Sequence, residues 1–494
     1  MDTPSCPQPA DSQEQQILTH LETIRDKLIL LKRDRTNYIR SQDVLPLYDE
    51  VIEQVRLLNA ARVGKEATYE NRVDRVLESC FQLISLFFMT IGRNYEAPAA
   101  YALTSTIKRL ADHLTESTLF SQKDLDSITH TLKKLTQYIE NGRDSHDPIV
   151  LDLLLKRTGL CKEMLKSLQA KQEPLGEPLP AIHEKLISIL RSISLANTRS
   201  KFSNSEVHKL SLQLAEIDAM RKEGNFLAPD GSVAEGSDTV SLLLFKCMKW
   251  AEIVQVKKGA IPAAFKPMYN DLVRVRSELD KISMTQAWSL RETDLYDFQR
   301  LLDRYDEARV DGNWLDNEGK PAELYVQRTL LYLVRRCYAY IYSLMISSEP
   351  VSEGLLPIYN QLQTLKRCLI EVKKNGGIGS PRELYPYSMK LNSIDNQRVD
   401  GKFLVNGDIP EGQGSVNELL AECFDLVYEL RIEAQNAVDE KAEAEEEARE
   451  TARAEQEEEE EREEAAKLRA EKAAAALVHA ERKEREEKEA KSQA

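Results

Sequence analysis

Five cysteines recur in similar apolar stretches, and thiolates are well suited to metal binding and redox chemistry. Their positions, 81, 86, 90 and 86 residues apart, are Cys80, Cys161, Cys247, Cys337 and Cys423. Structural zinc sites place ligands in pairs about two to four residues apart. Equivalent positions on packed helices lie about 8–10 Å apart, which is too far for a disulfide. The spacing therefore predicts a small apolar side chain at a crowded helix crossing.

The other groups that could do chemistry form no recognisable constellation. Cys6 and Cys368 have no histidine or cysteine at zinc-site spacing, and the seven histidines are scattered without an H-E-x-x-H pair. A glycine-rich stretch from Asn375 lacks the lysine of a phosphate-binding loop and follows an expected helix. We therefore predict no catalytic residue, no metal site and no cofactor, although distant residues could still assemble an active site.

Three arginines recur in the turns before the last three cysteines. These turns read RKEGNFLAPDG, RVDGNWLDNEG and RVDGKFLVNGD, each with an arginine three residues before a glycine and an aromatic residue two residues after it. Arginine and a following apolar residue commonly stabilise a helix end, which favours a structural role. A row of arginines could instead bind acidic or phosphorylated partners. The candidate partner-binding residues are therefore Arg221, Arg309, Arg398 and Trp314.

Helices must position these residues, because apolar side chains recur at three- and four-residue steps around all five cysteines. A second helix precedes each cysteine helix and ends in Gly64, Gly142, Gly224, Gly312 or Gly401. Glycine past a helix end takes the left-handed cap conformation without steric cost. A third helix precedes each of these and starts near Leu18, Tyr101, His183, Tyr269 or Tyr359.

Three markers with one period predict an all-α fold of about five tandem three-helix repeats, arranged as an open array or as packed bundles. The expected repeat domain spans residues 14–438, with repeats at roughly 14–97, 98–176, 177–260, 261–350 and 351–438. A disordered leader, residues 1–13, precedes it. A long charged tail, residues 439–494, follows it as a helix or a disordered segment.

The tail carries most of the acidic charge. Of the net −15, residues 439–494 contribute −9, from 12 basic and 21 acidic side chains. Large apolar residues are limited to Leu468, Leu477 and Val478, too few for a strong coiled coil. Oppositely charged pairs four residues apart favour a solvated single helix. Such a tail could act as a spacer, a solubiliser or a binder of basic proteins such as histones.

Composition limits which cellular compartments and which partners we expect. The N-terminus has no basic and apolar signal segment. The longest apolar run, Leu83–Gly92, is too short to cross a bilayer and is predicted to be a buried helix segment. The cysteines lack a disulfide framework, which indicates a reducing compartment, the cytoplasm with the nucleus as an alternative. An acidic chain disfavours direct nucleic-acid binding. The sequence does not indicate which oligomeric state the protein adopts.

The junctions GNWLDNEGKPAELYVQRTLLYLVRRCYAYIYSL and VDGKFLVNGDIPEGQGSVNELLAECFDLVYEL resemble a fungal family of proteins of unknown function, mainly cytoplasmic and nuclear. The resemblance covers about residues 15–435 and implies no catalytic motif. We therefore expect a soluble, non-enzymatic scaffold or adaptor that binds protein partners. The alternatives are an enzyme or small-ligand binder with a pocket between helical repeats, and a binder of basic proteins through the acidic tail.

Overall fold

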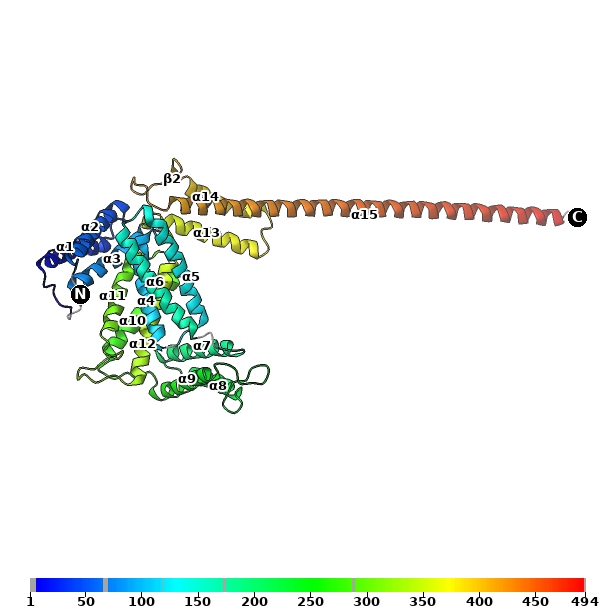
Figure 1. The fold of residues 1–494 in the computed structure, drawn as a ribbon. Coiled ribbons are helices and arrows are strands. Elements are labelled where there is room, and N and C mark those ends of the chain that lie inside the picture. The colour runs from blue at the N-terminus through cyan, green and yellow to red at the C-terminus, as the bar shows by residue number, and fades with distance from the viewer. Residues whose placement is uncertain (1–5, 65–69, 118, 172–174, 287–288, 493–494) are drawn as a thin grey trace. The chain divides into compact units, whose positions relative to one another are not determined.

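The computed structural model describes residues 6–64, 70–117, 119–171, 175–286 and 289–492. In these ranges it contains fifteen α-helices and one two-stranded ladder, which confirms the predicted all-α class (Figure 1). The chain divides into two compact units. We call residues 1–360 and 398–417 the main unit, and residues 361–397 and 418–494 the second unit.

The α-helices of the main unit follow one another in groups of three. The first group is α1 (Ser12–Arg33), α2 (Ser41–Ala61) and α3 (Arg72–Thr90). The second is α4 (Ala100–Ser117), α5 (Gln122–Asn141) and α6 (Pro148–Ala170). The third is α7 (Leu179–Asn197), α8 (Asn204–Ala219) and α9 (Ser237–Lys257). The fourth is α10 (Lys266–Lys281), α11 (Leu295–Glu307) and α12 (Leu324–Ile346).

The remaining elements include two helices that run through both units, α13 (Leu356–Lys374) and α15 (Gln413–Ser492). Helix α14 (Tyr385–Asp395) belongs to the second unit, and strands β1 (Arg398–Val399) and β2 (Lys402–Phe403) belong to the main unit. Short 3-10 turns are η1 (Ala97–Ala99), η2 (Gly142–Asp144), η5 (Glu292–Asp294), η6 (Glu353–Leu355) and η7 (Pro381–Leu384), and η3 (Ile282–Gln286) is a π-helical turn.

Local sequence explains where several helices begin. Asn71 caps α3 by accepting a hydrogen bond from the amide of Val73, while Asp74 accepts one from the amide of Asn71. Two amides that have no carbonyl partner within the helix are therefore hydrogen-bonded. Ser121 and Asp124 form the same capping box ahead of α5. Such reciprocal caps stabilise a helix start by roughly 1 kcal/mol.

In each of these four groups the third helix meets the first at the recurring cysteine, and α15 meets α13 in the same way at Cys423. The five thiols are free and buried, and each lies against a backbone carbonyl oxygen of the first helix. The Sγ–O pairs are Cys80–Leu21 at 3.6 Å, Cys161–Thr104 at 3.9 Å, Cys247–Leu186 at 3.8 Å, Cys337–Leu272 at 3.9 Å and Cys423–Leu362 at 3.5 Å. The cysteines therefore pack at helix crossings, as predicted.

Burial should make these thiols unreactive in the folded protein. It raises the pKa of Cys80, Cys247 and Cys337 to about 12, so the reactive thiolate is scarce at neutral pH. Cys368 is exposed. With a thiol-specific disulfide reagent, we expect Cys368 to react at once and the five buried thiols to react only after denaturant is added. Rapid labelling of Cys337 in the native protein, read by peptide mapping, would contradict this packing.

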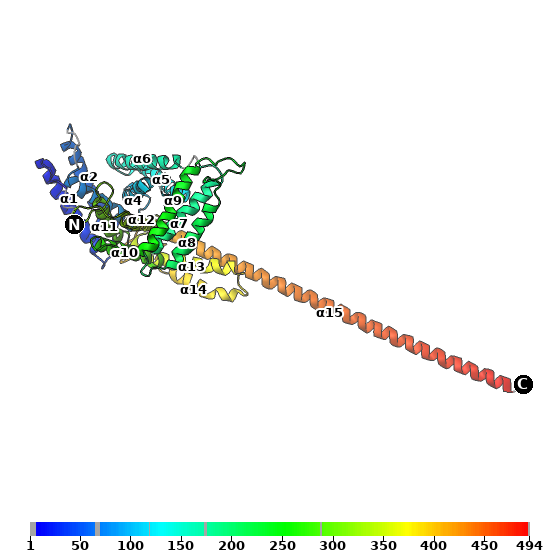
Figure 2. The same ribbon diagram turned by 90° about the horizontal axis from the view of Figure 1, so that it is seen from below.

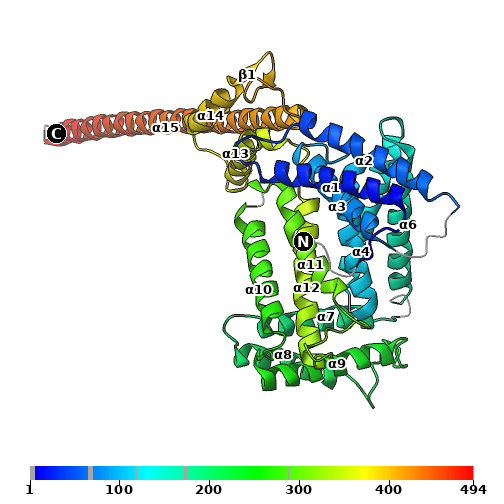
Figure 3. The same ribbon diagram turned by 90° about the vertical axis from the view of Figure 1, so that its left-hand side faces the viewer.

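The first four groups form one body, because the fourth group contacts the first and second groups as well as the third. Helix α12 packs against α4 and α7, and α11 packs against α3 (Figure 3). Helix α3 is the most enclosed, since every residue from Ser79 to Thr90 is buried. The longest apolar run of the sequence therefore lies in the core, as predicted. Figure 2 shows α7, α8 and α9 side by side.

The predicted glycine caps need correction. Gly142 follows α5 with φ of −77°, so it does not adopt the left-handed conformation. Gly224, Gly312 and Gly401 have positive φ but lie beyond their helices, as the second residue of hairpin turns. The residue before each, Glu223, Asp311 or Asp400, also has positive φ. Two consecutive left-handed residues define a type I′ turn, which favours glycine.

The two ends of the predicted repeat domain are partly described. Residues 1–5 of the leader lie outside the described residues. From Cys6 onward the leader contacts the fold, since the amide of Arg72 donates to the carbonyl of Pro7 at 3.0 Å and α1 already begins at Ser12. At the other end, α15 continues through the tail, and its described side chains beyond residue 438 are exposed. No helix in the described ranges is long and apolar enough to cross a membrane.

Candidate functional site

Two of the three predicted arginines bind their own turns, and the third binds the following helix. Arg221 pairs with Asp218, and its Nη1 donates to the carbonyl of Gly224 at 3.3 Å. Arg309 makes the equivalent bond to Gly312 at 3.4 Å. Arg398 lies in β1 and its Nη1 donates to Asn417 at 3.4 Å. The three therefore have a structural role in supporting the hairpins, and their partner-binding role stays a prediction.

Trp314 lies inside the fold. Its side chain is 1% exposed, and its indole N–H donates to the carbonyl of Tyr305 at 2.8 Å. Gln327 of α12 clamps the backbone of Trp314, accepting from its amide at 3.1 Å and donating to its carbonyl at 3.0 Å. Gln413 holds Phe403 in the same way. The aromatic residue of the turn therefore anchors the hairpin to the following helix, and a partner could reach Trp314 only after local opening.

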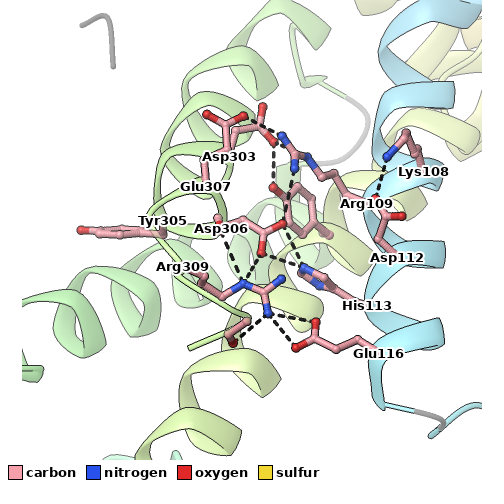
Figure 4. Close-up of polar contacts among 12 residues, drawn as sticks. Lys108, Arg109, Asp112, His113, Glu116, Asp303, Tyr305, Asp306, Glu307 and Arg309 are labelled. Carbon is pink, nitrogen blue, oxygen red and sulfur yellow. Dashed lines mark hydrogen bonds and ion pairs between the residues drawn. The ribbon is translucent and has the colours of Figure 1, made fainter. Parts of the chain in front are cut away.

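A cluster of charged side chains joins α4 to α11 (Figure 4). Arg109 Nη2 lies 2.7 Å from Glu307 Oε1, and Arg109 Nε lies 3.3 Å from Asp303 Oδ1. One turn along, His113 Nε2 lies 3.0 Å from both carboxylate oxygens of Asp306. Residues four apart on α4 therefore face residues three and four apart on α11, as the helical period requires.

Arg309 extends this cluster beyond the end of α11. Its Nε lies 3.0 Å from Asp306 Oδ1, and its Nη1 lies 2.9 Å from both oxygens of Glu116 on α4. The guanidinium also lies over the ring of Trp314, 5.7 Å from the centroid. With its side chain 13% exposed, Arg309 contributes more to holding α4 and α11 together than to the surface.

The pKa values of two carboxyl groups in the cluster are shifted in opposite directions. Burial alone would raise the pKa of Asp306, but the hydrogen bond and charge of His113, with Arg309 and Arg109, lower it below its ordinary value. Burial raises the pKa of Asp303 despite the nearby Arg109. The hydroxyl of Tyr338 donates to Asp303 at 2.8 Å. Asp306 is therefore the carboxylate whose charge the cluster stabilises.

A pocket of about 360 Å³ lies beside the cluster, lined from α3, α4, α6, α11 and α12. Glu307 Oε1 is shared inside it, at 2.7 Å from both Arg75 and Arg109. Two buried polar atoms of the lining, Oε1 of Gln299 and Nε of Arg157, have no hydrogen-bond partner. The pocket could therefore accept a polar molecule that donates to Gln299 and accepts from Arg157.

The chemistry of the cluster is that of a compensated ionic network. Its carboxylates face guanidinium or imidazole groups, so it fixes two helices against each other. In the part of the chain that the structure describes, no group of three or more His, Cys, Asp or Glu side chains could hold a metal ion. Sequence reasoning missed the cluster. Arg109 and His113 are spaced correctly for one helix face, but no sequence signal links them to residues about 190 positions away.

The chain is similar to one family model over two segments and to two fungal proteins over most of its length. A family model described as "Protein of unknown function (DUF2408)" matches residues 172–292 and 351–451. A CUB1 family protein of Schizosaccharomyces pombe is 38% identical over 451 residues, covering 89% of this chain and 97% of that protein. The Cu(2+) suppressing and bleomycin sensitive protein 1 of Saccharomyces cerevisiae is 36% identical over 507 residues, covering 87% and 92%.

No solved structure matches the chain. The two relatives match over nearly their whole lengths, which confirms the resemblance to a fungal family of unknown function. The chain thus belongs to the CUB1 family of fungal proteins.

Proposed function

We propose that the protein is a non-enzymatic scaffold that binds other proteins, and that the exposed apolar face of α9 is its main partner surface. Leu242, Phe245 and Met248 are 55%, 57% and 38% exposed. Their three-residue spacing places them along one side of α9. Large apolar side chains that share one exposed face commonly mark an interaction site. This stripe is the observation that carries the proposal.

The partner we propose is an amphipathic helix of another protein. A stripe repeating every three residues along a helix matches the ridges and grooves of helix–helix packing. The opposite face of α9 already packs against α7 and α8 through residues such as Cys247 and Trp250. A partner helix would therefore complete the burial of α9 without unfolding its neighbours.

The repeat boundaries and the compartment belong to the same proposal. The recurring cysteine contact supports five repeats over residues 14–438, with a tail at 439–494 that acts as a spacer. Arg221, Arg309 and Arg398 would form a second, weaker surface for acidic partners, because each residue is partly exposed. We place the protein in the cytoplasm, with access to the nucleus.

The test is affinity capture followed by calorimetry with the purified partner. We expect Leu242→Asp/Phe245→Asp to lower partner affinity at least tenfold, because two anchor side chains become charged. Leu160→Asp is the matched control, since Leu160 is 53% exposed on α6, and it should bind as the native chain does. Circular dichroism checks that each variant is folded.

Each other outcome contradicts part of the proposal. Full binding by the α9 variant would remove α9 as the surface, and loss only in an Arg221→Glu/Arg398→Glu variant would move the surface to the arginines. Loss only in a chain ending at Val438 would assign binding to the acidic tail, as expected of a binder of basic proteins. No stoichiometric partner in any variant would overturn the scaffold role.

A second candidate function is binding of a small polar ligand in the 360 Å³ pocket, favoured by the two unpaired atoms of Gln299 and Arg157. Ligand binding to the folded state raises the melting temperature. A metabolite that raises it in the native chain and not in Gln299→Leu would support this function. A Gln299→Leu variant that responds equally would exclude this pocket as the site.

A further inference from the structure

A second pocket, of about 690 Å³, opens between α1 and α11 in the main unit. We call it the basic groove, because its lining includes Arg25, Lys32, Arg33, Arg35, Arg300 and Arg304 against only three aspartates. The whole chain has a net charge of −15. A concave surface with a positive surplus therefore runs against the charge of the molecule, and it focuses a positive potential inside the groove.

The three aspartates of the basic groove already have partners. Each pairs with one basic side chain of the same lining: Asp26 with Arg25, Asp294 with Arg35, and Asp297 with Lys32. Arg33, Arg300 and Arg304 form no ion pair with any residue in the described ranges. Arg300 lies near enough to Asp303 to feel its charge, and Arg304 lies over the ring of Tyr305, 5.3 Å from the centroid, but none of the three guanidinium groups is paired with a carboxylate.

Their positions suit one shared ligand. Arg300 and Arg304 are four residues apart on α11, so they project from the same helix face, and Arg33 is the last residue of α1 on the other side of the groove. Basic residues often end a helix, and this rule by itself explains Arg33. That rule does not account for Arg300, which is half-buried in the second turn of α11. A half-buried, unpaired guanidinium is costly unless an anion joins it.

We propose that the basic groove binds a small organic anion carrying clustered phosphate groups. Guanidinium groups pair with phosphate oxygens through two parallel hydrogen bonds, and three of them match two or three phosphates. The groove volume falls in the range of small-molecule sites, roughly 300–1,000 Å³. The hydroxyls of Ser79 and Tyr296 meet in the same lining, 2.5 Å apart, and offer one further donor. This site goes beyond the scaffold role and needs no protein partner.

The test is calorimetric titration of the full chain with inorganic tripolyphosphate at about 0.15 M salt, where non-specific attraction is screened. We expect saturable binding of one molecule, weakened at least tenfold in Arg300→Gln/Arg304→Gln. The control Arg274→Gln removes an exposed arginine of α10 that pairs with Glu278, and it should bind normally. Parallel titrations with ATP and with inositol hexakisphosphate show whether a linear or a ring-borne set of phosphates binds tighter.

Two results would overturn the proposal. One is the absence of saturable tripolyphosphate binding. The other is equal weakening by Arg274→Gln and by the double variant, which would indicate a general charge effect. If circular dichroism shows that the double variant is unfolded, Arg33→Gln decides, because Arg33 is exposed at a helix end. An unchanged affinity in Arg33→Gln would then remove the site.

Discussion

Replacing Asp306 with alanine is expected to lower the free energy of unfolding by about 3–5 kcal/mol, the usual cost of removing one partner from a buried ionic group. The carboxylate of Asp306 is 4% exposed and is contacted by His113, Arg309 and Arg109 at 3.0, 3.0 and 3.7 Å. Alanine would leave His113 without an acceptor and would remove one of the carboxylates that face Arg309 and Arg109. Urea unfolding followed by circular dichroism measures the loss.

The matched control lies in the same cluster. Asp112 pairs with Lys108 four residues away on α4, at 2.8 Å, and both side chains are well exposed (Figure 4). Exposed pairs of this kind contribute about 0.3–0.5 kcal/mol, so Asp112→Ala should be nearly neutral. Equal, small losses in the two variants would show that the cluster does not hold α4 to α11.

The pH dependence of the Asp306 effect has a definite sign. The folded state lowers the pKa of Asp306 below the unfolded value of about 3.9. Its stabilisation is therefore complete above that value and disappears as the pH falls through the lower folded value. The difference between the native chain and Asp306→Ala should therefore shrink as the pH falls below about 4.

The sequence was informative wherever a period repeated. Helical spacing around the cysteines predicted the all-α class, and the apolar run that ends at Gly92 predicted the enclosed helix α3. Local patterns report the face that a helix buries, because that face repeats every 3.6 residues. They also identified the cysteines as packing residues, because equivalent positions on packed helices lie about 8–10 Å apart, which is too far for a disulfide.

Contacts between distant segments left no such signal. The Asp306–His113 pair joins residues 193 positions apart, and the basic groove combines α1 with α11. The hairpin turns were missed for another reason. Gly224, Gly312 and Gly401 suit a helix cap and a type I′ turn equally well, because both need positive φ. Only the position of the helix end separates the two, and sequence patterns locate helix ends poorly.

Gly92→Ala is expected to destabilise the main unit by about 3 kcal/mol or more. Gly92 ends α3 in a Schellman motif, with φ of +86° and with the amide of Arg93 donating to the carbonyl of Phe88 at 2.8 Å. A Cβ there would lie 2.6 Å from the amide nitrogen of Ser352, whose N–H donates to the carbonyl of Glu411. The variant therefore bears both a left-handed alanine, about 1–2 kcal/mol, and a displaced backbone, about 1–3 kcal/mol.

Gly64→Ala separates these two costs. Gly64 also has positive φ, +75°, but a Cβ there would meet no atom within 4 Å, so only the cost of the left-handed conformation, about 1–2 kcal/mol, applies. The free energies of unfolding of the two variants, measured in urea, should differ by the cost of displacing the segment at Ser352. If Gly92→Ala were no worse than Gly64→Ala, the end of α3 would not be pressed against that backbone. Because Gly412 approaches Val351 of the same segment, at 2.7 Å from its Cβ position to Cα, Gly412→Ala should repeat the Gly92→Ala result.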